Sequence, residues 1–206
     1  MFTSNGLNVK IHIITPLSRM LNIKSLAENI NRECSIHDGI VWWIIKDLSL
    51  KDYYIDKTDI ICPVFIVQND DPVNKGGHGS RNIALDLMIK SNIPGTDWIY
   101  NLDDDNMLHP NLINLINKAQ QDKFSGILTT QSFKNGNVRL LASNSNVRPF
   151  HVDMAMMACE FSLTKEIRLN KNDYCSDGYY ISTIYNNNPA MFKIYSEIGC
   201  YYNYLR

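Results

Sequence analysis

Closely spaced cysteine pairs are missing from this sequence. Its five cysteines are scattered, and no two of them form a C-x-x-C arrangement. Zinc knuckles and thioredoxin-type redox sites depend on that spacing, so the sequence predicts neither of them. An odd number of cysteines without a recognisable signal peptide is typical of a reducing compartment, and we expect a cytoplasmic protein.

Long apolar runs and an excess of one charge are also absent. No apolar stretch reaches ~18 residues, which is the length that a membrane-spanning helix needs. The formal net charge of -1 gives no electrostatic reason to expect a nucleic-acid partner. We therefore expect no transmembrane segment and no nucleic-acid binding, while peripheral contact with a membrane stays open.

The two common phosphate-binding loops do not occur either. The glycine-rich stretch 70–79 has no Gly-Lys-Ser/Thr, so it is not a P-loop. A dinucleotide fingerprint would directly follow the first strand, whereas Gly77-His78-Gly79 lies far downstream and Asn82 replaces its third glycine. Arg81 still supplies a cation close to a predicted helix start, where the helix dipole is positive. The alternative for Arg81 is an ordinary exposed arginine on a helix.

Strand-like and helix-like runs alternate through the first 125 residues. This alternation predicts parallel strands with helices on both faces of the sheet. The total of 206 residues favours one domain, residues 1–206, with a sizeable core. The predicted strands are 9–16, 40–47, 59–70, 97–105 and 125–133, and the predicted helices are 20–31, 81–91 and 110–121.

The remaining third of the chain predicts further, antiparallel strands. Asn135-Gly136 is a strong hairpin turn between 125–133 and a strand at 138–143. Beyond it, 152–163 is expected to be extended or buried, 177–185 is compatible with a helix, and 191–205 with a closing strand. The expected fold class is α/β: one mixed, Rossmann-like sheet with flanking helices and an added hairpin.

Polar residues follow three of the predicted strands. They are Thr15 and Pro16 after the first strand, Asp47 after the second, and Asp103-Asp104-Asp105 after the fourth. Ligands of such sheets bind beyond the carboxyl ends of the strands. The sequence therefore predicts that these side chains share one rim, together with the glycine-rich loop before Ser80, which is the expected cap of the next helix.

The acidic triplet is compatible with a cation site. If the strand continues through it, Asp103 and Asp105 point to one side and Asp104 to the other. Mg²⁺ or Mn²⁺ takes one or two protein carboxylates and leaves other positions for phosphate oxygens. The alternative is a solvated turn that caps the helix beginning near Pro110.

At this point the chain resembles a known family. The order "ITP", a strand ending in Asp, "SRNIAL" and "LDDDN" is similar to GT-A-fold nucleotide-sugar glycosyltransferases. "RPFHVDMAMMACEF" at 148–161 is similar to the "RPFPVDMAGFAV" block of the β-1,3-glucuronyltransferase family, whose aspartate motif also carries the trailing Asn of "DDDN". The resemblance extends over most of the chain and is patchy between the motifs.

The resemblance implies a role for each matched residue. Thr15, Pro16, Asp47 and Arg81 would contact the nucleotide, with Asp47 on uracil and Arg81 near the phosphates. Asp103 and Asp104 would hold the ribose, Asp105 would be the direct Mn²⁺ or Mg²⁺ ligand with Asp103 beside it, and Arg148 and Asp153 would line the sugar and acceptor pocket. Asp177 would replace the family's catalytic glutamate. Residues 9–125 would then form the nucleotide-binding part and 126–206 the acceptor side.

Two departures from the family pattern weaken the expected donor grip. Leu17-Ser18 follows Thr15-Pro16, where the family has an aromatic residue that stacks on uracil. No histidine follows His151, whereas the family has a C-terminal histidine that reaches the diphosphate.

These residues are also chemically coherent without the family. A cation and an arginine neutralise a departing diphosphate, and one carboxylate on the opposite face activates the acceptor hydroxyl, which gives inversion. We therefore expect a metal-dependent inverting glycosyltransferase that uses a nucleotide-sugar donor, UDP-linked first, and a carbohydrate or glycolipid acceptor. The alternatives are a nucleotidyltransferase and a non-catalytic nucleotide- or sugar-binding module. Asp177 as a helix cap and Asp153 as a buried structural acid are the alternatives for those two residues.

Overall fold

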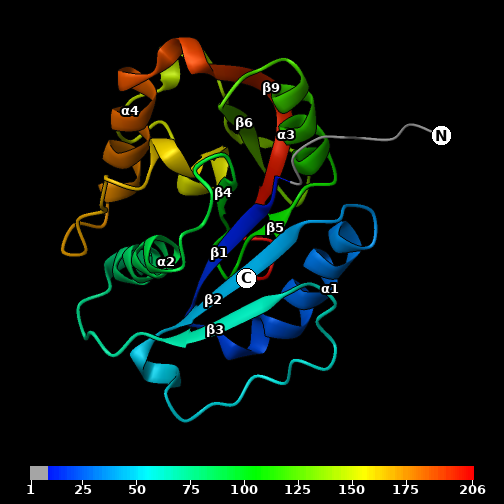
Figure 1. Cartoon of the computed structure of the whole chain (residues 1–206), viewed down its shortest axis with the longest axis vertical. Coiled ribbons are helices and arrows are strands. Elements are labelled where there is room, and N and C mark those ends of the chain that lie inside the picture. The colour runs from blue at the N-terminus through cyan, green and yellow to red at the C-terminus, as the bar shows by residue number, and fades with distance from the viewer. Residues whose placement is uncertain (1–8) are drawn as a thin grey trace.

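Runs rich in β-branched and aromatic residues form the first four strands, and three of these strands are buried. In the computed structural model, which describes residues 9–206, the neighbours along the sheet are β3 (Val64–Gln68), β2 (Ile40–Lys46), β1 (Ile11–Leu17) and β4 (Trp98–Asn101), all parallel. Every residue of β1 and all but the last of β2 are buried, because helices cover both faces of these strands (Figure 1). The predicted parallel half of the sheet is confirmed.

The second half of the chain extends this sheet with strands of mixed direction. β8 (Met157–Glu160) pairs antiparallel with β4, and β6 (Gly126–Phe133) pairs antiparallel with β8. β9 (Phe192–Tyr202) runs parallel to β6, and the short β5 (Met107–Leu108) closes that edge. The predicted hairpin is present between β6 and β7 (Val138–Leu140), and Gly136 takes the left-handed conformation that its turn requires (φ 85°).

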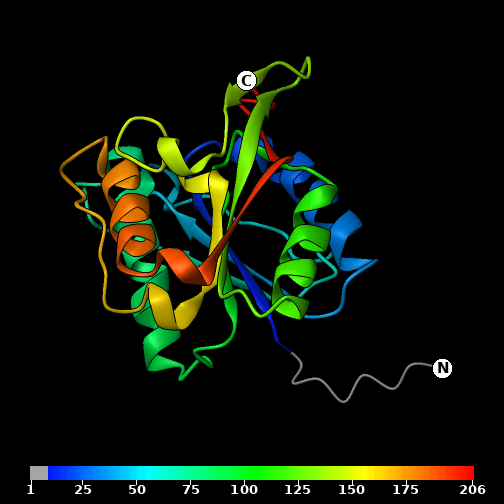
Figure 2. The ribbon, with the colours of Figure 1, turned by 90° about the horizontal axis from the view of Figure 1, so that it is seen from above.

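Four helices cover the two faces of the sheet. Figure 2 shows α1 (Ile23–Cys34) and α3 (Asn111–Gln121) on one side of the strands, and α2 (His78–Lys90) and α4 (Ser176–Asn187) on the other. The apolar side chains of α1 and α3 share one core with β1, β2 and β4, whereas α2 packs on the opposite face and α4 packs on β6 and β8. The α/β fold class predicted from the alternation is thus confirmed.

Short 3₁₀ turns connect the main elements, and several of them border the cleft described below. They are Met20–Asn22, Leu48–Leu50, Lys75–Gly77, Asn144–Asn146, Met154–Met156, Phe161–Leu163 and Pro189–Met191.

Several predicted element ends are wrong, each for a local reason. Pro63 lacks an N–H for the ladder, so the strand predicted at 59–70 begins only at Val64. The strand predicted at 97–105 ends at Asn101, and the acidic triplet lies in a turn that the hydrogen bond from Asn106 N to Asp103 O closes. Ser80 is not a helix cap, because α2 already begins at His78.

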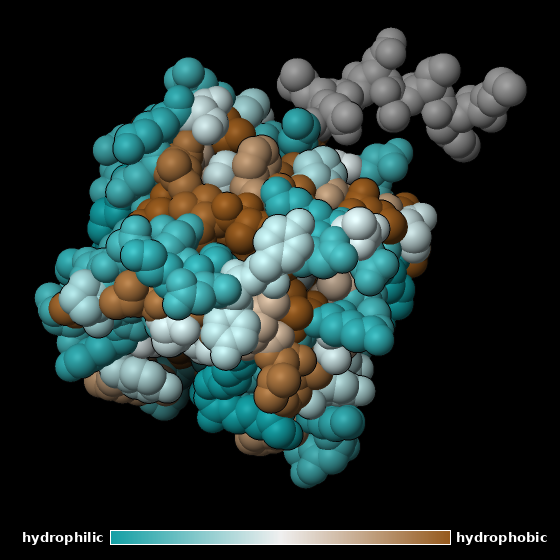
Figure 3. Space-filling view, turned by 90° about the horizontal axis from the view of Figure 1, so that it is seen from below, coloured by the Kyte–Doolittle hydropathy of each residue, from teal (hydrophilic) through white to brown (hydrophobic). Residues whose placement is uncertain are grey.

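The exposed edge of the sheet at β3 carries some apolar side chains. Figure 3 views the molecule from below and shows hydrophobic residues gathered between hydrophilic ones on this face. Phe65 on β3 and Ile61 on the segment before it are exposed apolar side chains. Among residues 9–206, every helix is too short or too polar to cross a bilayer.

Candidate active site

A cleft of about 530 Å³ opens at the carboxyl ends of β1, β2 and β4. The glycine-rich loop and the first turn of α2 border it on one side, and the first turn of α4 and the segment before β8 border it on the other. The structure brings eight of the ten predicted site residues to this cleft: Pro16, Asp47, Arg81, Asp103, Asp104, Asp105, Asp153 and Asp177.

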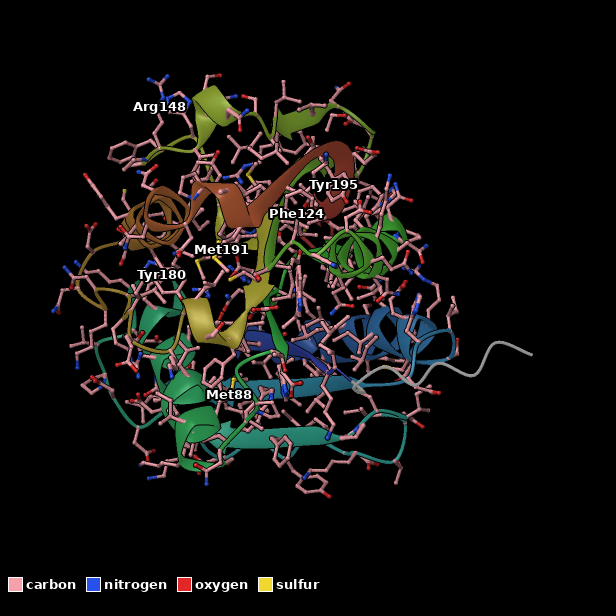
Figure 4. The ribbon with its side chains drawn as sticks, turned by 45° about the horizontal axis from the view of Figure 1, so that its top comes forward. Met88, Phe124, Arg148, Tyr180, Met191 and Tyr195 are labelled. Atoms are coloured by element: carbon pink, nitrogen blue, oxygen red, sulfur yellow. The ribbon has the colours of Figure 1, made fainter. Side chains whose placement is uncertain are left out.

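Two predicted site residues do not line the cleft. Thr15 is buried within β1, and its hydroxyl accepts a hydrogen bond from Trp42 Nε1 at 2.9 Å. Arg148 is exposed, and Figure 4 places it at the outer edge of the molecule. Their roles in binding nucleotide and sugar stay predictions, and the shape of the cleft does not favour them.

Asp104 supports the loop after β1. Its carboxylate accepts hydrogen bonds from the backbone N–H groups of Ser18 (2.6 Å) and Arg19 (2.7 Å) and from the Ser18 hydroxyl (2.9 Å). The Arg19 guanidinium forms an ion pair with the same carboxylate. With this many donors at one buried carboxylate, the acidic triplet fixes the loop that forms one wall of the cleft.

Asp103 faces Arg81 across the floor of the cleft, and the two side chains form an ion pair. Withdrawal from water raises the pKa of Asp103, and repulsion from the carboxylates of Asp153, Asp105 and Asp104 adds to this, although Arg81 acts in the opposite direction. The site therefore concentrates more negative charge than its arginines neutralise locally.

Asp105 is buried and meets two arginines at the cleft. Its Oδ2 lies 2.6 Å from Arg206 Nε and 3.3 Å from Arg19 Nη1. Its backbone carbonyl accepts a hydrogen bond from Leu205 N at 3.0 Å. The segment after β9 is thereby joined to the acidic triplet. Arg206 brings a positive charge to Asp105, a role that the sequence analysis does not predict for it.

The donor set at this point fits a cation shared with a ligand better than a closed metal cage. Among residues 9–206 no group of three or more His, Cys, Asp or Glu side chains is arranged to hold a metal ion. Mg²⁺ and Mn²⁺ need only one or two carboxylates when phosphate oxygens complete the shell. Asp105 and Asp103, which both line the cleft, supply that number.

Asp47 lies at the end of β2 and accepts hydrogen bonds from several neutral donors. Asn74 Nδ2 donates to it at 3.0 Å, and the Ser49 backbone and hydroxyl donate at 3.1 and 2.9 Å. Burial raises the pKa of Asp47, but the hydrogen bonds from Asn74 and Ser49 outweigh it and leave that pKa below its usual value. Asp47 is therefore an ionised acceptor on the rim, and it also caps the 3₁₀ turn Leu48–Leu50.

Arg81 is almost fully buried, yet it lines the cleft. Its Nη1 donates to Gly76 O at 2.5 Å and lies 3.3 Å from His78 Nδ1, while its Nε has no hydrogen-bond partner within residues 9–206. Gly77, with φ at 73°, allows the loop to pass this closely, because a Cβ there would lie 2.6 Å from Pro16 Cβ. The glycine-rich loop thus positions a buried guanidinium with a free donor beside the positive end of α2.

His78 is held neutral by this arrangement. Burial and the adjacent Arg81, whose guanidinium faces Nδ1, lower the pKa of His78 to about 4, although the contact of Nε2 with Tyr174 O at 3.2 Å acts in the opposite direction. A histidine with a depressed pKa stabilises the fold above the unfolded pKa of 6.5, and that contribution is lost as the pH falls toward 4.

We expect His78→Gln to reduce the acid sensitivity of folding. The wild-type chain should lose roughly 2–3 kcal/mol of unfolding free energy through His78 between pH 7 and pH 4. Glutamine keeps a hydrogen-bond donor and an acceptor but does not titrate. The unfolding free energy of the variant should therefore fall less steeply as the pH is lowered. Urea unfolding at several pH values measures this, with the exposed His151→Gln as control; equal slopes in all three proteins would contradict the assignment.

Asp153 belongs to a second polar cluster, on the far side of the cleft. It accepts from Arg139 Nη1 at 2.9 Å, from Gln131 Nε2 at 3.3 Å and from Ala155 N at 3.1 Å. The Arg139 guanidinium lies 3.5 Å from the Tyr202 ring centroid. Sequence reasoning missed Arg139, although its place beside the predicted hairpin turn was the available signal.

Asp177 lies in the first turn of α4 and does not cap that helix, because the N-cap is Cys175. It lines the same cleft as Asp103 and is half-buried, and within residues 9–206 its carboxylate accepts a hydrogen bond only from Gly178 N, at 2.8 Å. Burial raises the pKa of Asp177, and repulsion from Asp153 contributes, against the attraction of Arg81 and Arg139. A carboxylate with a raised pKa and few hydrogen-bond donors is better suited to act as a general base than an ordinary surface aspartate.

The fold, but not the sequence, matches known proteins. No protein-family model matches the chain, and no curated protein matches it in sequence. TarS of S. aureus, in a structure with UDP-GlcNAc, matches with a TM-score of 0.67 and 14% identity, over 94% of this chain and 58% of that chain. Glucosyl-3-phosphoglycerate synthase of Mycobacterium tuberculosis, with Mg²⁺ and UDP, gives a TM-score of 0.55 and 12% identity, over 92% and 70%.

A nucleotidyltransferase is as similar in fold as the glucosyl-3-phosphoglycerate synthase and less similar than TarS. A putative glucose-1-phosphate thymidylyltransferase of Bacillus anthracis matches with a TM-score of 0.56 and 12% identity, over 93% of this chain and 87% of that chain. Against the three TarS structures, this chain spans 36% to 60% of their length. These similarities show that the chain has the Rossmann-like GT-A fold that the sequence predicts. The narrower resemblance to β-1,3-glucuronyltransferases stays a prediction.

Proposed function

We propose that this chain transfers a sugar from a nucleoside-diphosphate donor to a carbohydrate acceptor with inversion, and that the donor is a UDP-sugar. One observation carries the proposal. A single cleft joins the acidic triplet, Arg81 and Asp47 on one side to Asp153 and Asp177 on the other. Structures with the same fold contain UDP-GlcNAc, or UDP with Mg²⁺, which supports a nucleotide-sugar donor.

The donor half of the cleft suits a nucleotide diphosphate. Asp47 is an ionised acceptor for the N3–H of uracil, and the Arg81 guanidinium, which lines the cleft, is a donor for phosphate oxygens. Arg206 adds a further guanidinium at the cleft, next to Asp105, in a chain that lacks the diphosphate-binding histidine of the family that the sequence resembles. Asp105 and Asp103 would hold Mn²⁺ or Mg²⁺, which when bound stabilises the charge of the diphosphate.

The acceptor half supplies the base. Asp177 takes the proton of the acceptor hydroxyl while the oxygen of that hydroxyl bonds to the anomeric carbon of the donor. The bond from the anomeric carbon to the diphosphate breaks, and the nucleoside diphosphate leaves. Attack opposite the leaving group inverts the anomeric configuration. Arg139 holds Asp153 in place, so that Asp153 can accept a hydrogen bond from a sugar hydroxyl. Whether the transferred sugar is a hexose or a glucuronic acid is decided by the screen below.

Binding of donors is the first test. A thermal-shift screen of UDP-, GDP-, CDP- and dTDP-sugars, with and without Mn²⁺, should show the largest stabilisation with a UDP-sugar and Mn²⁺ together. A ligand at 100-fold saturation stabilises the fold by about 2.7 kcal/mol. No stabilisation by any nucleotide sugar would contradict the proposal.

Nucleotidyl transfer is the second candidate, because the thymidylyltransferase shares the fold over nearly its whole length. This reaction would join a sugar phosphate to the nucleotidyl group of a nucleoside triphosphate, which forms a nucleotide sugar and releases pyrophosphate. Pyrophosphate release without sugar transfer would favour it, and donor binding without turnover in either assay would favour a binding module.

A further inference from the structure

Two exposed aromatic side chains line the cleft beside the candidate base, and a third, Tyr179, packs against one of them without lining the cleft. Phe150, Tyr174 and Tyr179 are 70%, 73% and 50% exposed. Phe150 and Tyr174 line the cleft together with Asp177, and the ring centroids of Phe150 and Tyr179 lie 6.2 Å apart in an edge-on arrangement. Apolar rings of this size are normally buried, so a group of them beside the candidate base calls for a ligand.

The backbone holds these rings in place. Phe150 has φ at 68°, a conformation that a bulky residue adopts only when its surroundings impose it. Its segment packs directly on α4, where a Cβ on Gly178 would lie 3.1 Å from Phe150 N and from Pro149 Cα. Tyr174 is held on the other side, since its carbonyl oxygen lies 3.2 Å from His78 Nε2. The outward position of the two rings is therefore part of the fold.

Polar groups suited to sugar hydroxyls lie in the same cleft. Asp153 and Arg139 are paired there, and Asp177 keeps one carboxylate oxygen without a hydrogen bond to residues 9–206. Aromatic faces with a few fixed polar groups are the combination that binds a ring with one apolar CH face and hydroxyls at its edge.

We propose that Phe150, Tyr174 and Tyr179 form an aromatic platform that binds a pyranose ring of the acceptor through its CH face. The acceptor is thus a glycan or glycoside whose terminal sugar stacks on the platform, with its reactive hydroxyl directed to Asp177. This inference rests on the proposed function and adds the residues that select the acceptor.

A glycan array with neutral and charged carbohydrates tests the platform directly. The fluorescently labelled wild-type chain should bind at least one group of glycans. The double variant Phe150→Ala/Tyr174→Ala should bind that group at least 10-fold more weakly. Phe150→Tyr and Tyr174→Phe should retain binding, because stacking needs the ring. Tyr54→Ala, at an 83% exposed tyrosine outside the cleft, is the control and should bind as the wild type does.

UDP binding in the presence of Mn²⁺, measured by calorimetry on the same proteins, separates this inference from the proposed function. We expect unchanged UDP affinity in the double variant, which also shows that the variant is folded. Absence of glycan binding by the wild type, or full binding by the double variant, overturns the platform while donor binding stands. Absence of UDP binding in every protein overturns the proposed function itself, and the platform as an acceptor site with it.

Discussion

Replacing Asp177 with asparagine should reduce the rate of sugar transfer by ~10²–10⁴-fold, the usual cost of losing a general base. Asparagine has the same shape and can still accept the hydrogen bond from Gly178 N, so α4 should stay intact. Donor affinity should change little, because no hydrogen bond or ion pair within residues 9–206 joins Asp177 to Asp47, Arg81 or the acidic triplet. Initial rates with the UDP-sugar found in the screen, with UDP calorimetry alongside, measure both quantities.

The pH profile gives a second measurement of the same role. Burial, with repulsion from Asp153, raises the pKa of Asp177. Because a base acts in its deprotonated form, the rate should rise with pH through that raised pKa, and the acidic limb should lie above the pH at which an ordinary aspartate titrates.

The control is Asp173→Asn, four residues earlier, whose carboxylate accepts from Cys175 N at 2.9 Å and does not line the cleft. It should retain the wild-type rate. A near-normal rate in Asp177→Asn together with a large loss in Asp153→Asn would assign the base to Asp153. A product with retained anomeric configuration would rule out inversion for either carboxylate.

The architecture could be predicted from the sequence because periodicity and strand-forming runs are local signals. β1 and β2 follow largely apolar stretches, and α3 follows a regular helical pattern, so the element types and the mixed sheet are confirmed. Strand ends were harder. The strand expected through Asp105 stops at Asn101, because a turn closed by the hydrogen bond from Asn106 N to Asp103 O follows, and the backbone of Ser18 and Arg19 holds Asp104 in it.

The candidate site could be predicted in part for the same reason. The rim residues follow strand ends in the sequence, and parallel pairing alone brings Asp47 and Asp103 to one edge. The roles of Arg139 and Arg206 depend on the carboxylate that each one meets after folding. Arg139 pairs with Asp153, 14 residues further along the chain, and Arg206 pairs with Asp105, which is far from it in the sequence. Nothing local to these arginines in the sequence indicates such partners.

The hydrogen bonds of Asp104 show that the three adjacent aspartates do not all have the same role. The sequence presents three equivalent aspartates, yet the structure commits one of them to the loop after β1 through Ser18 and Arg19. The alternation expected for a strand also fails, since the triplet lies in a turn. Only Asp103 and Asp105 are therefore available to a cation and phosphate, while the wall of the cleft depends on Asp104.

Asp105→Ala should abolish the gain in UDP affinity that Mn²⁺ provides, and Asp105→Asn should do nearly the same while keeping acceptors for Arg206 and Arg19. A metal contact of several kcal/mol corresponds to ~10²-fold or more in affinity. Calorimetry with UDP, with and without Mn²⁺, measures the gain, and far-UV circular dichroism shows whether the variants are folded. If Mn²⁺ still raises UDP affinity in both variants, Asp105 is not the cation ligand.

Arg206→Ala tests the same carboxylate in the opposite direction. The guanidinium of Arg206 lies 2.6 Å from Asp105 Oδ2 and is 53% exposed, so it competes with a cation for that oxygen in the absence of nucleotide. Its removal should tighten Mn²⁺ binding to the nucleotide-free protein and weaken UDP binding without metal, because one positive charge near the diphosphate is lost. Weaker Mn²⁺ binding in Arg206→Ala would mean that the arginine orders Asp105 for the cation instead of competing with it.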